Sequence, residues 1–169
     1  MAKLRPGRCY KKLHRPYTRQ SIHKPRKSYI KGAPKPRIAQ YEMGTKKNYS
    51  KKLFLVSEEA CQIRHNALES ARISIVKYLE KQIKEFFVKL RIYPHHVFRE
   101  NPLATGAGAD RFQQGMRMSF GRPIGTAARI RIGQRIFEVQ VDDENINVAK
   151  VALKRASHKL PAKCKILVE

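Results

Sequence analysis

The sequence predicts an α+β fold in which a mainly antiparallel sheet is covered by two helices. Short segments with an apolar residue at every second position are interspersed with two segments whose apolar residues recur every three or four positions. A long glycine-containing loop interrupts the strands, and a basic segment precedes them all. We therefore divide the chain into an arm (residues 1–52) and an α+β domain (residues 53–169) that carries a candidate functional loop at 101–115.

The arm is defined by its charge. The 169 residues include 37 Lys and Arg and 13 Asp and Glu, a formal net charge of +24. Residues 1–52 contribute 17 − 1 = +16, and residues 53–169 contribute 20 − 12 = +8. A compact enzyme for small metabolites rarely carries so much uncompensated charge, so we expect a polyanionic partner. No apolar run reaches the length of a membrane span, and residues 1–6 lack the apolar region of a secretory signal. The three widely separated cysteines fit a reducing compartment, so we expect a cytoplasmic protein.

The composition of the arm favours RNA as the polyanion. Five of the nine prolines and five of the seven tyrosines lie in it. Prolines favour extended backbone, and tyrosine rings stack on bases while neighbouring cations meet phosphates. A flexible basic tail or a localisation signal is the alternative. We predict an arm that orders on RNA, with contacts from Arg5, Arg8, Tyr10, Lys11, Lys12, Arg15, Tyr17, Arg19, Lys24, Arg26, Lys27, Tyr29, Lys31, Lys35, Arg37, Lys46 and Lys47.

The domain is predicted to begin with a strand at 52–56 and a long helix. Ser57 is a suitable N-cap, and the acids after it suit the positive end of a helix dipole. Apolar residues then recur at helical spacing from Ala60 to Leu79, so we expect this helix to run to about Gln82.

The second part of the domain alternates in the manner of strands. Residues 86–93 form a half-buried strand that Pro94 ends, 95–99 a second short strand, and 115–120 a third. Residues 126–132 form another, with a turn at Gly133 and a returning strand at 135–141. Three acids precede a second helix at about 145–158, and 163–168 is the last strand.

The loop at 101–115 is longer than most connections in compact domains. Gly106 and Gly108 do not form a dinucleotide fingerprint, because position 111 is arginine and no helix follows; a Gly-Lys-Ser/Thr phosphate loop is also missing, so we expect no nucleotide cofactor. The alternative is a mobile, solvent-exposed loop without a function of its own. The arginines at its root favour a slim finger that reaches a nucleic-acid site, and we count Arg117, Arg122 and Arg129 among the RNA contacts.

Catalytic and metal-binding patterns are weak. None of the six histidines has a zinc-binding spacing, and the three cysteines are too far apart for a metal pair or a disulfide framework. We expect no catalytic residue, no metal and no cofactor. Two alternatives stay open: an RNA-modifying enzyme with a basic guide arm, and a basic protein that coats membranes or compacts DNA.

Five segments together resemble one family. They are RPGRCY at 5–10, RIYPHHVFREN at 91–101, GADRFQQGMR at 108–117, FGRPIGTAAR at 120–129 and IGQ at 132–134. The combination is similar to the universal large-subunit ribosomal proteins called L-sixteen in bacteria and L-ten-e in archaea. Phe112, Gln114 and Met118, and the end of the chain at Glu169, favour an archaeal-type member over a eukaryotic one.

This resemblance implies a specific role. It implies an α/β-hammerhead type of fold, no enzymatic activity, and a place in the large subunit among rRNA, neighbouring ribosomal proteins and tRNA, with 5S rRNA as a further candidate partner. The arm would lie among rRNA helices. The loop would approach the P-site tRNA end near the peptidyl-transferase centre through Leu103, Ala104, Thr105, Gly106, Ala107, Gly108, Ala109, Asp110, Arg111, Phe112 and Gln113.

Overall fold

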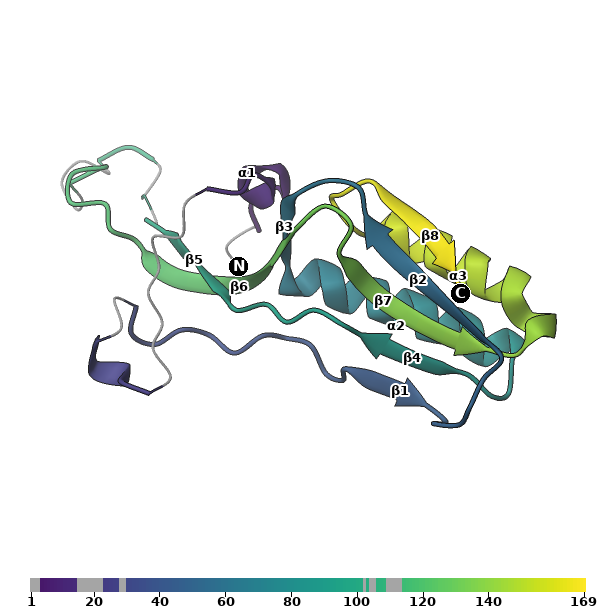
Figure 1. Ribbon diagram of the computed structural model, residues 1–169. Coiled ribbons are helices and arrows are strands. Elements are labelled where there is room, and N and C mark those ends of the chain that lie inside the picture. The colour runs from purple at the N-terminus through teal and green to yellow at the C-terminus, as the bar shows by residue number, and fades with distance from the viewer. Residues whose placement is uncertain (1–3, 15–22, 28–29, 102, 104–105, 109–113) are drawn as a thin grey trace.

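A computed structural model shows two antiparallel sheets and two long helices, which confirms the predicted α+β class (Figure 1). The structure describes residues 4–14, 23–27, 30–101, 103, 106–108 and 114–169. Every strand pair within these residues is antiparallel. The hammerhead type, and the roles of the arm and the loop, stay predictions.

The larger sheet has five strands in the order β1-β4-β7-β2-β8. Its strands are β1 (Glu42–Gly44), β4 (Phe87–Leu90), β7 (Arg135–Val141), β2 (Lys51–Ser57) and β8 (Cys164–Val168). The strands β7 and β2 lie inside the sheet and each buries five of its seven residues, which are mainly apolar.

Two helices cover one face of this sheet (Figure 1): α2 (His65–Gln82) and α3 (Ile146–Ser157). Each helix buries a stripe at three- and four-residue spacing, which in α2 is Leu68, Ala71, Ile75 and Leu79. Alternate residues of the central strands join that stripe in the hydrophobic core, so the intervening residues of the same strands lie on the open face of the sheet.

The smaller sheet has the order β3-β6-β5, with β3 (Cys61–Arg64), β6 (Arg122–Ile130) and β5 (His96–Glu100). The chain passes between the sheets four times, from β2 to β3, from β3 through α2 to β4, from β4 to β5 and from β6 to β7. The smaller sheet therefore extends the larger one, and β5 and β6 carry the segment between them to one end of the molecule (Figure 1).

Short helical turns complete the fold: α1 (Arg8–Lys11), η1 (Pro25–Lys27) and η3 (Asp143–Asn145). The last of these occupies the acidic turn before α3. The strand β1 also lies within residues 1–52, a segment for which the sequence suggested no strand. Its Met43 is buried and opposes Val88 of β4.

The predicted start of the first helix is wrong. Ser57 does not cap a helix; it is buried at the end of β2, and its hydroxyl donates to the carbonyl of Glu59 at 2.7 Å. Residues 61–64 form β3, and α2 begins only at His65. Cys61 and Ile63 fit both a helical and an alternating pattern, and pairing with β6 decides between them.

Two further predictions are wrong. Residues 115–118 form a turn, not a strand, because the alternating Met116, Met118 and Phe120 are all exposed and have no apolar surface to pack on. The strand β7 does not return along β6 as a hairpin. Instead, Gly133 N–H in the turn donates to the carbonyl of Ser57 at the end of β2, at 2.8 Å. This hydrogen bond directs the chain after the turn into the larger sheet.

Candidate nucleic-acid interface

Acidic side chains are largely occupied by neighbouring cations. Within the described part of the chain, ion pairs engage at least eight acids: Glu42, Glu59, Glu69, Glu85, Glu100, Glu138, Asp142 and Glu169. The protein is strongly basic, so most cations have no acid left to pair with. The distribution of these pairs therefore shows which surfaces are neutral and which stay positive.

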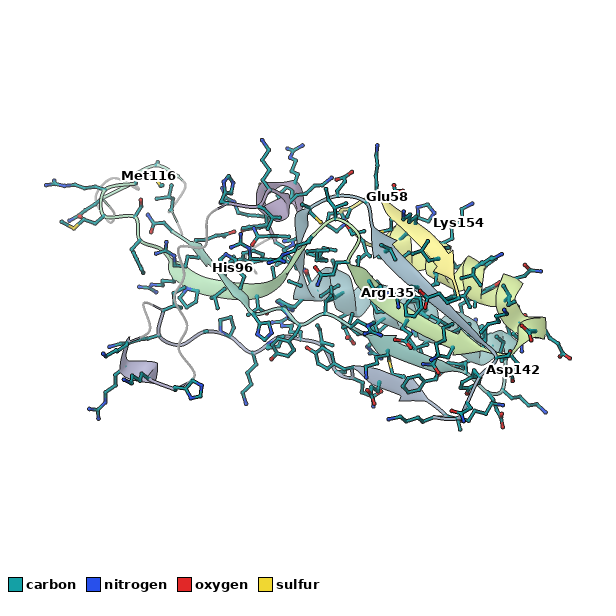
Figure 2. The ribbon with its side chains drawn as sticks, viewed as in Figure 1. Glu58, His96, Met116, Arg135, Asp142 and Lys154 are labelled. Carbon is teal, nitrogen blue, oxygen red and sulfur yellow. The ribbon has the colours of Figure 1, made fainter. Side chains whose placement is uncertain are left out.

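Three ion pairs lie on the open face of the larger sheet. Lys89 of β4 bonds to Glu42 of β1 at 2.5 Å, and Arg91 bonds to Glu138 of β7 at 2.6 Å. Arg135 pairs with Glu169 and also lies 4.0 Å from the ring centre of Phe54 (Figure 2). Such a lattice of opposite charges offers little attraction to a phosphate backbone.

Glu138 is the most buried acid of this face. Burial raises the pKa of its carboxyl, but hydrogen bonds from Gln140 and Arg91 outweigh burial and hold that pKa below its ordinary value. The carboxylate is therefore charged at neutral pH and has two donors, as a buried charge requires. This arrangement stabilises the sheet and leaves the Glu138 carboxylate with no need of a further partner.

Residues 4–14 lie against the smaller sheet through their backbone. Gln62 of β3 donates to the carbonyls of Tyr10 and Lys12 at 3.2 and 3.1 Å. Arg64 donates to the carbonyl of Arg5 at 2.9 Å, and Arg129 donates to that of His14 at 2.8 Å. Because these contacts use main-chain oxygens, they leave the side chains of Arg8 and Lys12 exposed.

The next described part of the arm is tied to α2. Arg37 N–H donates to His65 Nδ1 at 3.2 Å, and Ala39 N–H donates to a carboxylate oxygen of Glu69 at 3.3 Å. Burial and the charges of Arg37 and Arg64 lower the pKa of His65, which keeps its ring neutral and its Nδ1 free to accept. The basic segment thus follows the side of the domain on its way to β1.

The structure places most of the predicted RNA contacts at the surface. Those that are exposed are Arg5, Arg8, Lys12, Lys24, Arg26, Lys27, Lys31, Lys35, Arg37, Lys46, Lys47, Arg117 and Arg122; half-buried are Tyr10, Lys11 and Arg129. At least five are partly engaged within the protein. Arg5 pairs with Glu100 at 4.0 Å, Lys11 with Glu59 at 2.7 Å, and Lys47 with Glu85 and Asp142. Arg129 donates to the carbonyl of His14, and the ring of Tyr10 stacks on Phe98 at 4.6 Å. Arg15, Tyr17, Arg19 and Tyr29 lie outside the described residues.

The predicted loop is described only in part. Leu103, Gly106, Ala107 and Gly108 are exposed, while Ala104, Thr105 and residues 109–113 lie outside the described residues. Both glycines have positive φ angles, +137° and +77°, which most other residues adopt only with strain. Figure 2 shows Met116, which follows the loop, at the end of the molecule opposite the acidic Asp142.

Two residues that the sequence reading passed over lie beside the loop. Arg99 is at the end of β5, and its guanidinium carbon is 3.8 Å from the ring centre of Phe120. Both belong to quoted motifs, but only the pairing of β5 with β6 brings them together. Arg64 was also missed as a contact of the arm, because it was expected to lie on a helix.

The described residues offer little to other classes of site. Among the residues that the structure describes, no cluster of three His, Cys, Asp or Glu has a geometry suited to a metal ion. In the same residues, no helix is both long and apolar enough to cross a membrane. The cysteines are free, and burial raises the pKa of the Cys164 thiol to about 11, so it is a weak nucleophile at neutral pH.

The fold and these charges define a basic α+β protein whose anionic sites are mostly neutralised internally and whose cations are mostly not. Comparison with protein families matches residues 17–167 to the family described as Ribosomal protein L16p/L10e. The chain belongs to this family and is an archaeal-type member of it. It is therefore a ribosomal structural component rather than an enzyme.

Individual relatives agree over nearly the whole length. The large ribosomal subunit protein uL16 of Archaeoglobus fulgidus is 46% identical over 168 residues, 98% of this chain and 92% of the relative. That of Staphylothermus marinus is 48% identical over 168 residues, 97% of this chain and 92% of the relative. That of Methanococcus aeolicus is 46% identical over 169 residues, with 98% and 94% covered.

Proposed function

We propose that this protein is a constituent of the large ribosomal subunit in the cytoplasm, where it binds rRNA and helps to position tRNA near the peptidyl-transferase centre. The names of its relatives place those proteins in the large subunit. Neighbouring ribosomal proteins are further partners, and 5S rRNA is a candidate. No comparison supports the alternative of an RNA-modifying enzyme.

The observation that carries the proposal is the contrast between two surfaces. The open face of the larger sheet carries three ion pairs, whereas exposed cations such as Arg8, Lys12 and Arg26 have no ion pair within the described residues. Cations that meet phosphates release the counterions of the RNA, and this release drives binding. The mechanism is therefore charge neutralisation together with shape recognition, without covalent chemistry.

The division into arm and domain fits this mechanism. The arm supplies most of the positive charge, and its backbone contacts with β3, β6 and α2 aim that charge away from the core. The sequence of the loop from 103 to 113 has no net charge and consists mainly of small residues, which suits a crowded site between RNA strands. We assign rRNA binding to the predicted arm residues with Arg117, Arg122 and Arg129, and the approach to tRNA to the loop.

A charge-matched pair of variants tests the rRNA surface. The first replaces Arg8, Lys12 and Arg26 by glutamine, and the second replaces Lys77, Lys81 and Lys84, which lie on and just after α2. Both lower the net charge equally. We expect only the first to weaken binding of the full chain to a large-subunit rRNA fragment and to reduce the salt slope by roughly one for each lost phosphate contact. Equal losses would show that net charge alone acts and that the arm is no specific surface.

Deletion of residues 103–113 tests the loop. We expect rRNA binding and subunit incorporation to persist while tRNA-dependent steps of translation slow down. Failure of the deleted protein to enter the subunit would instead make the loop an assembly element.

A further inference from the structure

Among the described residues of the domain, the most exposed large aromatic side chain is held by an arginine. Phe120 is 61% exposed, although the Arg99 guanidinium carbon lies only 3.8 Å from its ring centre. A guanidinium at that distance covers one face of a ring. The exposed surface of Phe120 must therefore consist mainly of the opposite face and the ring edge.

The backbone around Phe120 is fixed to β5. Gly121 has φ +80°, and a Cβ at this position would lie 2.9 Å from the carbonyl carbon of Glu100, so the two strands touch closely here. Phe120 N–H donates to the carbonyl of Met118 at 2.8 Å. The Asn101 side-chain amide donates to the carbonyl of Gly115 at 3.1 Å and closes the base of the connecting segment. The ring is thus presented from a braced position and not from a free loop.

Other described aromatic rings near the candidate interface contact partners within the protein. Tyr10 stacks on Phe98. Tyr93 contacts two rings, Tyr41 at 5.5 Å and His95 at 4.5 Å. Phe54 has the same kind of arginine partner as Phe120 but is only 2% exposed, so that pair serves packing. Tyr93 is 46% exposed but is held between two rings, whereas Phe120 is more exposed and has an arginine on one face only.

The charge around Phe120 indicates what that face receives. From residue 96 to 131 the sequence contains six arginines and two acids, and one of those acids, Glu100, is 4.0 Å from Arg5. Arg117 and Arg122 are exposed on either side of Phe120. An apolar protein surface would gain nothing from this charge. An unpaired nucleotide makes two favourable contacts here, because its base stacks on the ring and its phosphates pair with the arginines.

We propose that Phe120, backed by Arg99, is a stacking platform for an unpaired RNA base at the end of the β5–β6 unit. This rests on the proposed function, that the protein binds RNA, and deepens it by naming a residue that reads single-stranded nucleotides. The phosphate-neutralising arm binds paired and unpaired RNA alike, whereas the platform requires a base outside a duplex.

Fluorescence provides a direct test, because the chain contains no tryptophan. In the full chain, Phe120→Trp creates a single reporter on the platform, and Tyr93→Trp creates a control in a ring cluster. The probes are an RNA hairpin with an unpaired loop and a fully paired duplex of similar length. We expect the hairpin to quench the emission of the Phe120→Trp protein strongly, the duplex to quench it little, and the control to respond to neither.

Affinity provides the second test. Phe120→Leu keeps an apolar side chain but removes the flat ring, and the position is exposed, so the fold should persist. We expect roughly tenfold weaker binding of the hairpin, unchanged binding of the duplex and an unchanged salt slope, with Phe120→Tyr restoring the affinity. Tyr93→Leu is the matched control.

The outcomes separate this inference from the proposed function. If hairpin and duplex bind with a steep salt dependence but neither quenches the reporter, the platform is excluded and rRNA binding stands. Equal quenching by both RNAs also excludes a preference for unpaired bases. If neither RNA binds at any salt concentration, the proposed function itself fails.

Discussion

The side-chain amide of Gln62 donates to the carbonyl oxygen of Tyr10 at 3.2 Å, and also to that of Lys12 at 3.1 Å. Gln62 is 8% exposed and belongs to β3, whereas its two acceptors belong to the basic arm. Part of the arm is therefore bound to the domain before any RNA is present. The domain forms hydrogen bonds with the backbone of that segment and leaves the side chains of Arg8 and Lys12 exposed to a ligand.

Replacement of Gln62 by leucine should release this part of the arm. The substitution removes two hydrogen bonds, and carbonyls that lose their donor when buried cost about 1–3 kcal/mol. We expect faster hydrogen exchange at residues 8–12 and a loss of stability of that order. Gln82→Leu, at the exposed end of α2, is the control. Unchanged exchange at residues 8–12 would show that the two bonds do not hold the arm.

Much of the fold could be predicted from periodicity. The strands β2 and β7 and the helix α3 were expected within a few residues of their observed bounds. The apolar residues of each segment follow either the strand period or the helix period, but not both. The strand β3 could not be foreseen, since Cys61 and Ile63 fit two patterns. Likewise β1 has three residues, and its single buried side chain, Met43, gives no period.

The candidate interface was predictable only in its composition. The sequence reveals a basic arm and a glycine-containing loop, because charge and small residues can be counted along a chain. It does not reveal that Gln62 binds the backbone of the arm, or that Arg99 backs Phe120. Those relationships depend on which strands pair, and the passage of the chain between two sheets is set by tertiary packing.

A close contact at Gly44 should make this glycine irreplaceable. Its φ is +87°, and a Cβ there would lie 2.1 Å from the carbonyl oxygen of Phe86. Gly133 has a similar φ of +79° with no atom within 4 Å, so Gly133→Ala measures the backbone strain alone, about 1 kcal/mol. We expect Gly44→Ala to cost clearly more in chemical denaturation. Equal costs would mean that β1 shifts freely away from β4.

The ion pair of Glu138 should contribute acid-sensitive stability. Its folded pKa lies below the ordinary value near 4.5, so the contribution is complete above that value and is lost as the pH falls through the folded pKa. Glu138→Gln should lower the stability at neutral pH by about 1–3 kcal/mol and flatten the decline below pH 4.5. Glu80→Gln on α2 is the control. A parallel decline in the Glu138 variant and in the unaltered protein would contradict this account.

His65 should produce a loss of stability at a higher pH. Its folded pKa is lowered from 6.5, first by burial and then by the charges of Arg37 and Arg64. Between 6.5 and that lower value the unfolded chain binds a proton that the folded chain does not, so stability falls as the pH falls through this window. Protonation also removes the acceptor for Arg37 N–H.

His65→Asn keeps an acceptor near the Nδ1 position but does not titrate, and it should reduce the pH slope in that window by up to about 1.4 kcal/mol per pH unit. Denaturation across the window measures this slope, and the exposed His23→Asn is the control. His96, whose pKa burial also lowers, is left in place in every variant and accounts for a residual slope. An unchanged slope in the His65 variant would mean that the contact between the arm and α2 does not depend on a neutral His65, and that this part of the arm stays docked through the acidic range.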